Sequence, residues 1–439
     1  MRYERNHFAF IVQAVQNSMY RFVKSDIKAL DGLNKGFLRK VEKRMYQTTV
    51  KGNIANKICS VLYYNKENGN WKEEMMQTLN GNLMAGNLLI ATVENGTITA
   101  CDKKFLPLQL CRTANVESWL ADRAIDRHRP NSRLLKKILR LRTAEDMEVA
   151  LEVNGATLTD NYWFCPLGSD KTYDDVKFLY NYFDTVALAG DPDGFSQKPS
   201  KTPELTNIGS YEKCWKVVDG KWWLYKAGSD AEYFSELFIC RLGIKMNFDT
   251  ARYEMDQGYI KTADFTEGRV NFETMSGITG DDDDYEVCFN ALLKISQDIA
   301  KQYLKLIWID TLCYNMDRHT KNFGILRSRQ TGEILSLAPN YDNNIALISR
   351  GYVKDVSRQK DGIIRFFNDF VSENETVAAE YRKMLENGEI PLLCETDIAE
   401  VLCEITADFT KIAEDSKDYL NAFILNGQKI MCEIIEENS

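Results

Sequence analysis

Three oxygen-bearing side chains between Leu306 and Ala346 have the types and the spacing that phosphoryl transfer needs. Asn322 follows Asp317 by five residues, and Asp342 comes after two short apolar runs. Kinases use this loop spacing to place a proton acceptor and a metal ligand, and a second aspartate to hold the metal that bridges the ATP phosphates. We therefore predict that Asp317 accepts a proton from a hydroxyl substrate and that Asn322 and Asp342 hold Mg²⁺.

A hairpin is predicted to connect the two loops. The apolar runs Phe323–Leu326 and Ile334–Leu337 are separated by the turn-like segment 327–332. An alternative remains open, because Asp and Asn also favour turns by bonding to their own backbone. In that case the two loops are only polar caps.

A second predicted hairpin supplies a lysine for the phosphates. The apolar runs Cys214–Val218 and Lys221–Lys226 flank the two-residue turn Asp219-Gly220. Lys226 ends the second strand, where kinases keep the lysine that pairs with the α- and β-phosphates. The alternative is a lysine that protects the end of an edge strand.

The segment from Leu205 to Lys213, just before this hairpin, is the candidate phosphate loop. Backbone N–H groups around Gly209 and Ser210 can bind phosphate oxygens. The segment has one glycine, whereas the usual protein-kinase loop has three. Farther along, Lys261 to Asp264 is the predicted contact for the edge of adenine.

A helix with a carboxylate that holds the lysine is expected after the second hairpin. Ser229 and Glu232 have the spacing of a capping box at a helix start. Either Glu232 or Glu236 lies at a suitable position to pair with Lys226, and Glu232 is favoured.

The segments 315–324 and 338–343 resemble the catalytic and metal loops of HipA-type serine/threonine kinases, known as bacterial toxin kinases. Lipid kinases of the phosphatidylinositol type share the Asp-Arg-His-x-x-Asn loop, but the continuation Ala-Pro-x-Tyr-Asp favours the HipA type. The candidate phosphate loop also matches the HipA pattern of Leu, Ser or Thr, two variable residues, Gly, and a Lys four residues later, which is Lys213 here. The resemblance implies ATP and Mg²⁺ as cofactors, a protein substrate, autophosphorylation at Thr206 or Ser210, and a possible small helix-turn-helix antitoxin as partner.

Composition limits the other classes of function. The chain has 439 residues and a formal net charge of −9, which argues against a broad nucleic-acid surface. With only 3 histidines, a histidine-rich metal centre is excluded. The sequence contains neither a signal-peptide pattern nor an apolar run of membrane-spanning length, so a cytoplasmic protein that does not bind membranes is expected.

The predicted fold is α+β, a bilobal protein-kinase-like fold with a small β-rich ATP-binding lobe and a larger helical lobe. An N-terminal α/β region covers residues 1–142, the small lobe 143–265 and the helical lobe 266–439. One long helix is expected between the acidic run 281–284 and Ile309, and four helices after Asp342, at 361–370, 375–386, 396–412 and 415–436. Two rival functions remain open, a lipid or small-molecule kinase and an inactive kinase scaffold that binds partners.

Overall fold

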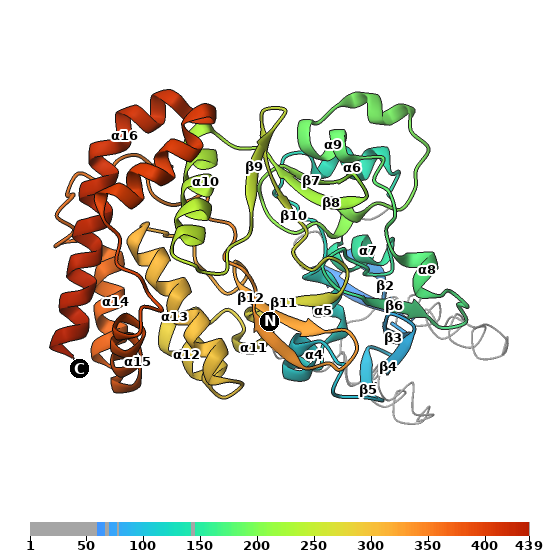
Figure 1. Ribbon diagram of the computed structural model, residues 1–439. Coiled ribbons are helices and arrows are strands. Elements are labelled where there is room, and N and C mark those ends of the chain that lie inside the picture. Colours follow the sequence, from blue (N-terminus) through green and yellow to red (C-terminus); the bar gives the residue numbers. More distant parts are fainter. Residues whose placement is uncertain (1–58, 66–69, 77–78, 142–144, 439) are drawn as a thin grey trace, which may run out of the picture. The chain divides into compact units, whose positions relative to one another are not determined.

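The computed structural model describes residues 59–65, 70–76, 79–141 and 145–438, which divide into the units Met1–Leu79 and Asn80–Ser439 (Figure 1). In the first unit, β1 (Cys59–Asn65) and β2 (Asn70–Met76) form an antiparallel hairpin. Of the predicted N-terminal region, residues 1–58 lie outside the described residues. The predicted boundaries at residues 142 and 265 stay predictions.

The second unit begins with an antiparallel sheet and a group of short helices. The sheet has the order β5-β4-β3-β6. Its strands are β3 (Gly81–Ala85), β4 (Leu88–Glu94), β5 (Thr97–Ala100) and β6 (Tyr162–Pro166). The helices are α4 (Leu108–Thr113), α5 (Val116–Ala121), α6 (Ser132–Ile138), α7 (Asp146–Leu151), α8 (Tyr173–Val176) and α9 (Asp184–Ala189). Trp163 and Phe183 are at the centre of their shared apolar core.

The predicted hairpin with the turn Asp219-Gly220 is confirmed. Asp219 and Gly220 have φ angles of 50° and 75°, as a type I′ turn requires. The sheet order is β7-β8-β10-β9, with β7 (Lys213–Val218), β8 (Lys221–Lys226), β9 (Tyr253–Asp256) and β10 (Tyr259–Ala263). Two 3₁₀ helices precede it, η1 (Pro192–Ser196) and η2 (Pro203–Thr206). Helix α10 (Asp230–Lys245) starts with the predicted capping box of Ser229 and Glu232.

The predicted hairpin between the two loops is also confirmed. Strands β12 (Gly324–Ser328) and β13 (Ile334–Leu337) pair antiparallel, and β11 (Val270–Thr274) extends the sheet. The helices before this hairpin are α11 (Ser276–Thr279), α12 (Tyr285–Leu293) and α13 (Gln297–Leu312). The prediction of one long helix here is wrong, because the chain breaks after α12 and the Ser296 side chain caps the start of α13.

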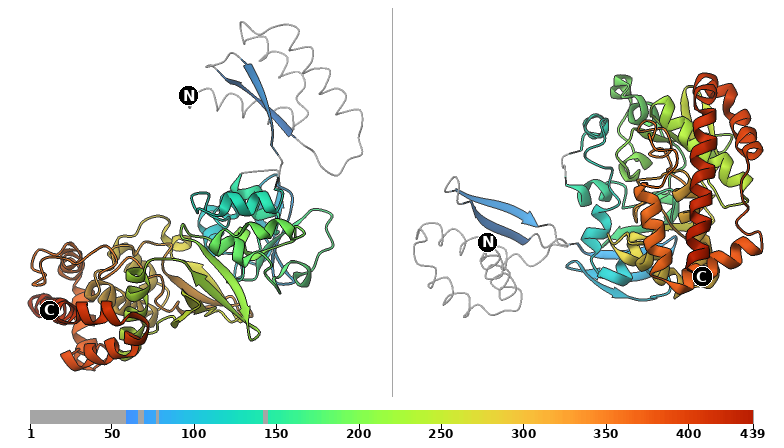
Figure 2. Two further views of the ribbon diagram at one scale, coloured as in Figure 1. Left: turned by 90° about the horizontal axis from the view of Figure 1, so that it is seen from above. Right: turned by 90° about the vertical axis from the view of Figure 1, so that its left-hand side faces the viewer.

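The C-terminal residues form α14 (Gly362–Ser372), α15 (Glu375–Glu386) and α16 (Glu395–Glu437). The span of α16 consists of two helices that meet at a kink at Phe409, where φ is −138° and ψ is 45°. The prediction of four helices is therefore confirmed, although the last break lies at Phe409 and not between residues 412 and 415. Within the second unit, helices α10 and α12 to α16 lie apart from the sheet of β3 to β6 (Figures 1 and 2). These helices share one apolar core.

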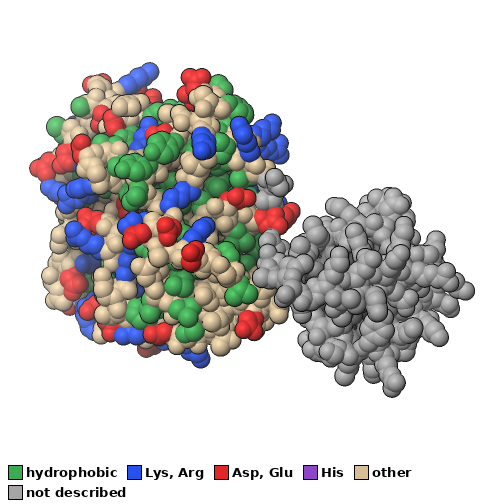
Figure 3. All heavy atoms as spheres, turned by 90° about the vertical axis from the view of Figure 1, so that its right-hand side faces the viewer, with side chains coloured by type: hydrophobic (Ala, Val, Ile, Leu, Met, Phe, Trp, Pro, Cys, Tyr) green, Lys and Arg blue, Asp and Glu red, His purple; other side chains and the backbone are tan. Residues whose placement is uncertain are grey.

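The described residues thus form a mixed α/β structure of small antiparallel sheets and helices. None of the described helices is long and apolar enough to cross a membrane. On the face of the second unit in Figure 3, acidic and basic side chains are interspersed with hydrophobic ones.

Candidate functional site

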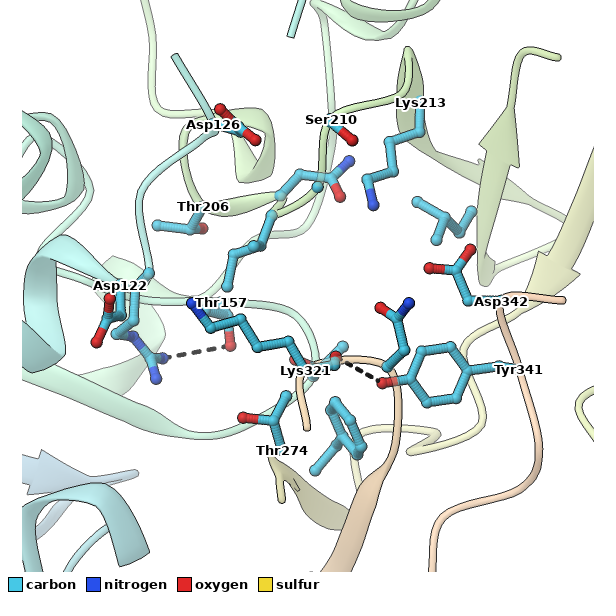
Figure 4. Close-up of a pocket in the computed structure, with 18 of the residues that line it drawn as sticks. Asp122, Asp126, Thr157, Thr206, Ser210, Lys213, Thr274, Lys321, Tyr341 and Asp342 are labelled. Atoms are coloured by element: carbon cyan, nitrogen blue, oxygen red, sulfur yellow. Dashed lines mark hydrogen bonds between the residues drawn. The ribbon is translucent and has the colours of Figure 1, made fainter. Parts of the chain in front are cut away.

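The predicted site residues border one cavity of about 980 Å³ in the second unit. They are Gly209, Ser210, Lys213, Lys226, Glu232, Asp317, Asn322 and Asp342. Figure 4 shows Lys213 and Asp342 directed into this cavity from different segments of the chain, with Ser210 beside Lys213. The fold therefore brings together residues that lie up to 133 positions apart (209 and 342).

Lys226 and Asp342 form the central ion pair of the cavity. The Nζ of Lys226 is 2.6 Å from Oδ1 of Asp342 and 3.7 Å from Oε2 of Glu236. The hydroxyl of buried Tyr253 lies between the two partners, because it accepts from Lys226 Nζ at 3.4 Å and from the Asp342 backbone N–H at 3.2 Å. The lysine is thus held by two carboxylates and a phenol.

These contacts also set the charge state of the pair. Burial raises the pKa of Asp342, but the ammonium groups of Lys226 and Lys213 outweigh this and lower it to about 2. Burial lowers the pKa of Lys226, but Asp342 and Glu236 outweigh this and raise it well above its ordinary value. Both groups are therefore charged at neutral pH. Asp342 has a left-handed φ of 62°, a conformation that Asp adopts more readily than most residues.

The carboxylate that faces Lys226 is Glu236, which corrects the preference for Glu232. Glu232 occupies the capping box, where its Oε2 accepts from the Ser229 backbone N–H at 2.8 Å, and its Oε1 accepts from the Tyr211 hydroxyl at 2.9 Å. Glu236 lies one helical turn further along α10 and is buried. Its Oε1 accepts from the Asn343 backbone N–H at 3.1 Å, next to Asp342.

Asp317 and Asn322 lie in the loop between α13 and β12 and contact each other. The Nδ2 of Asn322 donates to the Asp317 carbonyl at 2.8 Å and to Asp317 Oδ2 at 3.3 Å. Asp317 is half-buried and borders the cavity, so its carboxylate is accessible to a substrate hydroxyl. Because the Asn322 amide nitrogen faces Asp317, its Oδ1 is the atom that remains for a metal ion.

Arg318 ties this loop to the loop that carries Asp342. Its guanidinium makes a bidentate ion pair with Asp310 at the end of α13, at 2.7 and 3.0 Å, and the two side chains are 2% and 1% exposed. The same guanidinium donates to three groups around Asp342, the Tyr341 carbonyl and the side chains of Asn340 and Asn343. Arg318 therefore stabilises both loops.

The phosphate loop has backbone features that fit its proposed role. Gly209 has a φ of 120°, and a Cβ there would lie 2.2 Å from Lys213 Nζ, so glycine leaves room for the lysine. Burial lowers the pKa of Lys213 to about 8, despite the opposing effect of Asp342. Thr206 is buried and its hydroxyl donates to the Ala156 carbonyl at 2.7 Å, whereas Ser210 is exposed.

A mostly apolar surface of β8 and β10 continues from Lys226. Lys226 pairs with Ile260 and Leu224 with Thr262, so these four side chains share the face that borders the cavity. The Thr262 hydroxyl is buried and has no hydrogen-bond partner among the described residues. Of the predicted adenine contact, residues 262–264 border the cavity. Lys261 faces away and pairs with Glu254 and Asp256 at 3.0 Å each.

The donor set around Asp342 fits Mg²⁺ bound together with phosphates. Among the described residues, no group of three or more His, Cys, Asp or Glu side chains is placed to hold a metal ion. Kinase sites do not need such a group, because Mg²⁺ there binds one or two carboxylates, phosphate oxygens and water. The ionised Asp342 and the Asn322 amide oxygen are ligands of this hard-oxygen type.

Sequence reasoning missed Tyr253, which contacts Lys226 and Asp342, and Asp310, which pairs with Arg318. Neither residue belongs to a motif: Tyr253 stands between two charged residues, and Asp310 lies in an apolar segment. Asp310 could have been found, because a carboxylate in an apolar helical segment predicts a buried charge with a charged partner.

Arg318→Lys tests the coupling between the two loops. Lysine keeps the charge but loses the planar fork, so the free energy of unfolding should fall by about 1–3 kcal/mol. We expect amide hydrogen exchange, measured by mass spectrometry, to become faster in residues 313–323 and 338–346 together. Arg327→Lys is a matched control, because Arg327 is also buried and pairs with Glu273 at 2.9 Å, outside both loops. Faster exchange in only one loop of Arg318→Lys would contradict the coupling.

Comparison with known proteins agrees with the geometry. Residues 204–389 match the model of the HipA-like C-terminal domain family. No curated protein sequence matches the chain. The structure of HipA from Shewanella oneidensis MR-1, in a toxin–antitoxin complex with HipB and operator DNA, is similar with a TM-score of 0.55 and 12% identity. The similarity covers 81% of this chain and 98% of the Shewanella chain. The proinflammatory kinase CtkA from Helicobacter pylori gives a TM-score of 0.35 at 15% identity, covering 50% of this chain and 94% of its own. Residues 204–389 are thus similar to the HipA-like C-terminal domain, as the loops in segments 315–324 and 338–343 predicted.

Proposed function

We propose that the protein is an ATP- and Mg²⁺-dependent serine/threonine protein kinase of the HipA type. The observation that carries the proposal is the ion pair of Lys226 and Asp342, 2.6 Å apart in a cavity that Asp317 and Asn322 also border. A phosphotransferase needs this set of groups, because catalysis of phosphoryl transfer is mainly positioning and charge stabilisation.

In the proposed reaction, Asp317 orients the substrate hydroxyl and accepts its proton. The hydroxyl oxygen forms a bond to the γ-phosphorus, and the bond from phosphorus to the ADP oxygen breaks. Lys226 and Lys213 offset the negative charge of the phosphates, and backbone N–H groups near Gly209 hold their oxygens. Mg²⁺, held by Asn322 and Asp342, would supply further charge stabilisation on the phosphates.

The proposal extends to architecture and setting. We infer a bilobal arrangement in which residues 143–265 form the ATP-binding lobe and 266–439 the helical lobe, and a cytoplasmic location. The similar Shewanella protein, HipA, belongs to a toxin–antitoxin system and is seen with HipB and operator DNA. By analogy, we propose that this chain acts as a toxin with a small DNA-binding antitoxin as partner.

Asp317→Asn tests the catalytic assignment. Removal of the proton acceptor should lower the rate of γ-phosphate transfer from labelled ATP by about 10²–10⁴-fold. The melting temperature and ATP affinity should be unchanged, because Asp317 is half-buried and its carboxylate accepts one long hydrogen bond, at 3.3 Å. Asp283→Asn, an exposed change outside the cavity, is the matched control.

Retained turnover in Asp317→Asn would reject the assignment. The label also separates the rival functions when the protein is incubated alone, with lysate and with lipid vesicles. Labelled protein supports the proposal. Labelled lipid or small molecules would favour the first rival, and absence of ATP binding in calorimetry with Mg²⁺ would favour an inactive scaffold.

Autophosphorylation, if it occurs, should take place at Ser210 and not at Thr206. The Thr206 hydroxyl is buried and donates to the Ala156 carbonyl, so its phosphorylation would require the phosphate loop to leave its position. Ser210 is exposed and borders the cavity. After incubation with ATP and Mg²⁺, mass spectrometry should find the phosphate on Ser210 in the wild type and in Thr206→Val, and none in Ser210→Ala. A phosphate on Thr206 would contradict this expectation.

A further inference from the structure

A buried arginine from outside the matched domain lies against the backbone of the phosphate loop. Arg129 has a fully buried side chain. Its Nη1 donates to the Asn207 carbonyl at 3.3 Å, and its Nη2 donates to the Lys213 carbonyl. Asn207 and Lys213 are near the two ends of the loop, so one guanidinium contacts both ends.

The counterion of Arg129 connects the same two ends. Glu204 is 3.4 Å from Arg129 Nη2, and its side chain is also 0% exposed. Its Oε1 accepts from the Trp215 backbone N–H at 2.7 Å, after the loop, and its Oε2 accepts from Asn207 Nδ2 at 2.9 Å, at the start of the loop. Burial lowers the pKa of Arg129, and Glu204 opposes this shift.

Two further contacts come from residues that precede the matched domain. The Ile125 backbone N–H donates to the Leu205 carbonyl at 2.8 Å, and the Ala156 carbonyl accepts from Thr206. Ile125, Arg129 and Ala156 therefore all contact the phosphate loop, although the family match begins only at residue 204.

A buried ion pair contributes little to the stability of a fold, since its replacement by well-packed apolar side chains of similar volume is often neutral or stabilising. The pair can instead define a backbone conformation. A trans peptide group directs its N–H opposite to its C=O, so the Asn207 carbonyl bound to Arg129 turns the Ile208 N–H to the other side of the loop. Ile208 borders the cavity.

We propose that Arg129, paired with Glu204, is a positioning residue that fixes the phosphate loop in its nucleotide-binding conformation. It holds the loop carbonyls away from the phosphates, whose negative charge would repel them, and leaves N–H groups and Lys213 to bind. The N-terminal region is thus part of the nucleotide site. This inference rests on the proposed function, because it assumes that the loop binds phosphates.

Arg129→Lys and the double variant Arg129→Met/Glu204→Gln test the proposal. The double variant removes both charges, so it should fold without an unpaired buried ion. In both, the KM for ATP and the Kd of ATP with Mg²⁺ should rise about tenfold or more, the effect of one lost charge-assisted hydrogen bond. The kcat at saturating ATP should change much less. Amide hydrogen exchange should become faster in residues 205–213 even without nucleotide.

The matched control is Arg358→Lys. Arg358 is equally buried, pairs with Asp361 at 2.6 Å and donates to the carbonyls of Thr311 and Leu312, away from the phosphate loop. It should lower the melting temperature but leave the Kd for ATP and the exchange of residues 205–213 unchanged. A purely structural role for Arg129 predicts that Arg129→Lys behaves like this control, and that result would overturn the proposal. If the wild type binds no ATP, the proposed function fails, and hydrogen exchange of the loop still tests whether Arg129 fixes its conformation.

Discussion

The buried ion pair of Arg318 and Asp310 is the interaction on which the site depends most. It sits where α13 ends and joins a rigid helix to two loops that have no regular hydrogen bonding of their own. Because the guanidinium also donates to groups around Asp342, the loop with Asp317 and the loop with Asp342 share one anchor. Two further hydrogen bonds join the same loops, from the Leu347 backbone N–H to the Cys313 carbonyl at 2.8 Å and from Asn315 Nδ2 to Asn343 Oδ1 at 3.3 Å.

The other half of the cavity depends on strand register. Antiparallel pairing puts Lys226, Leu224, Ile260 and Thr262 on one face, so a charged end and an apolar surface lie side by side. Glu236, in the second turn of α10, faces Lys226, and the Arg129–Glu204 pair contacts the loop before β7. The pairing of β8 with β10, helix α10 and the buried Arg129–Glu204 pair therefore orient the groups around one cavity.

The sequence predicted best those features that local chemistry determines. The turn Asp219-Gly220 and the capping box at Ser229 are specified by backbone preferences of a few residues. The other hairpin was found from two apolar runs around the turn-like segment 327–332. Features that depend on tertiary packing were not found. The choice between Glu232 and Glu236 depends on which helical turn lies above Lys226, and the extra helix start depends on Ser296, which was not recognised as a cap. Arg129 and Tyr253 belong to no motif, because buried partners far along the chain give them their roles.

The central claim is that one space receives a nucleotide, a metal ion and a substrate hydroxyl. The most direct measurement is a crystal structure with a non-hydrolysable ATP analogue and Mn²⁺, a magnesium substitute that anomalous scattering locates. We expect the anomalous peak between the oxygens of Asn322 and Asp342, with the triphosphate beneath Gly209 and against Lys226. A peak elsewhere while the nucleotide is bound, or a nucleotide bound outside this cavity, would contradict the account.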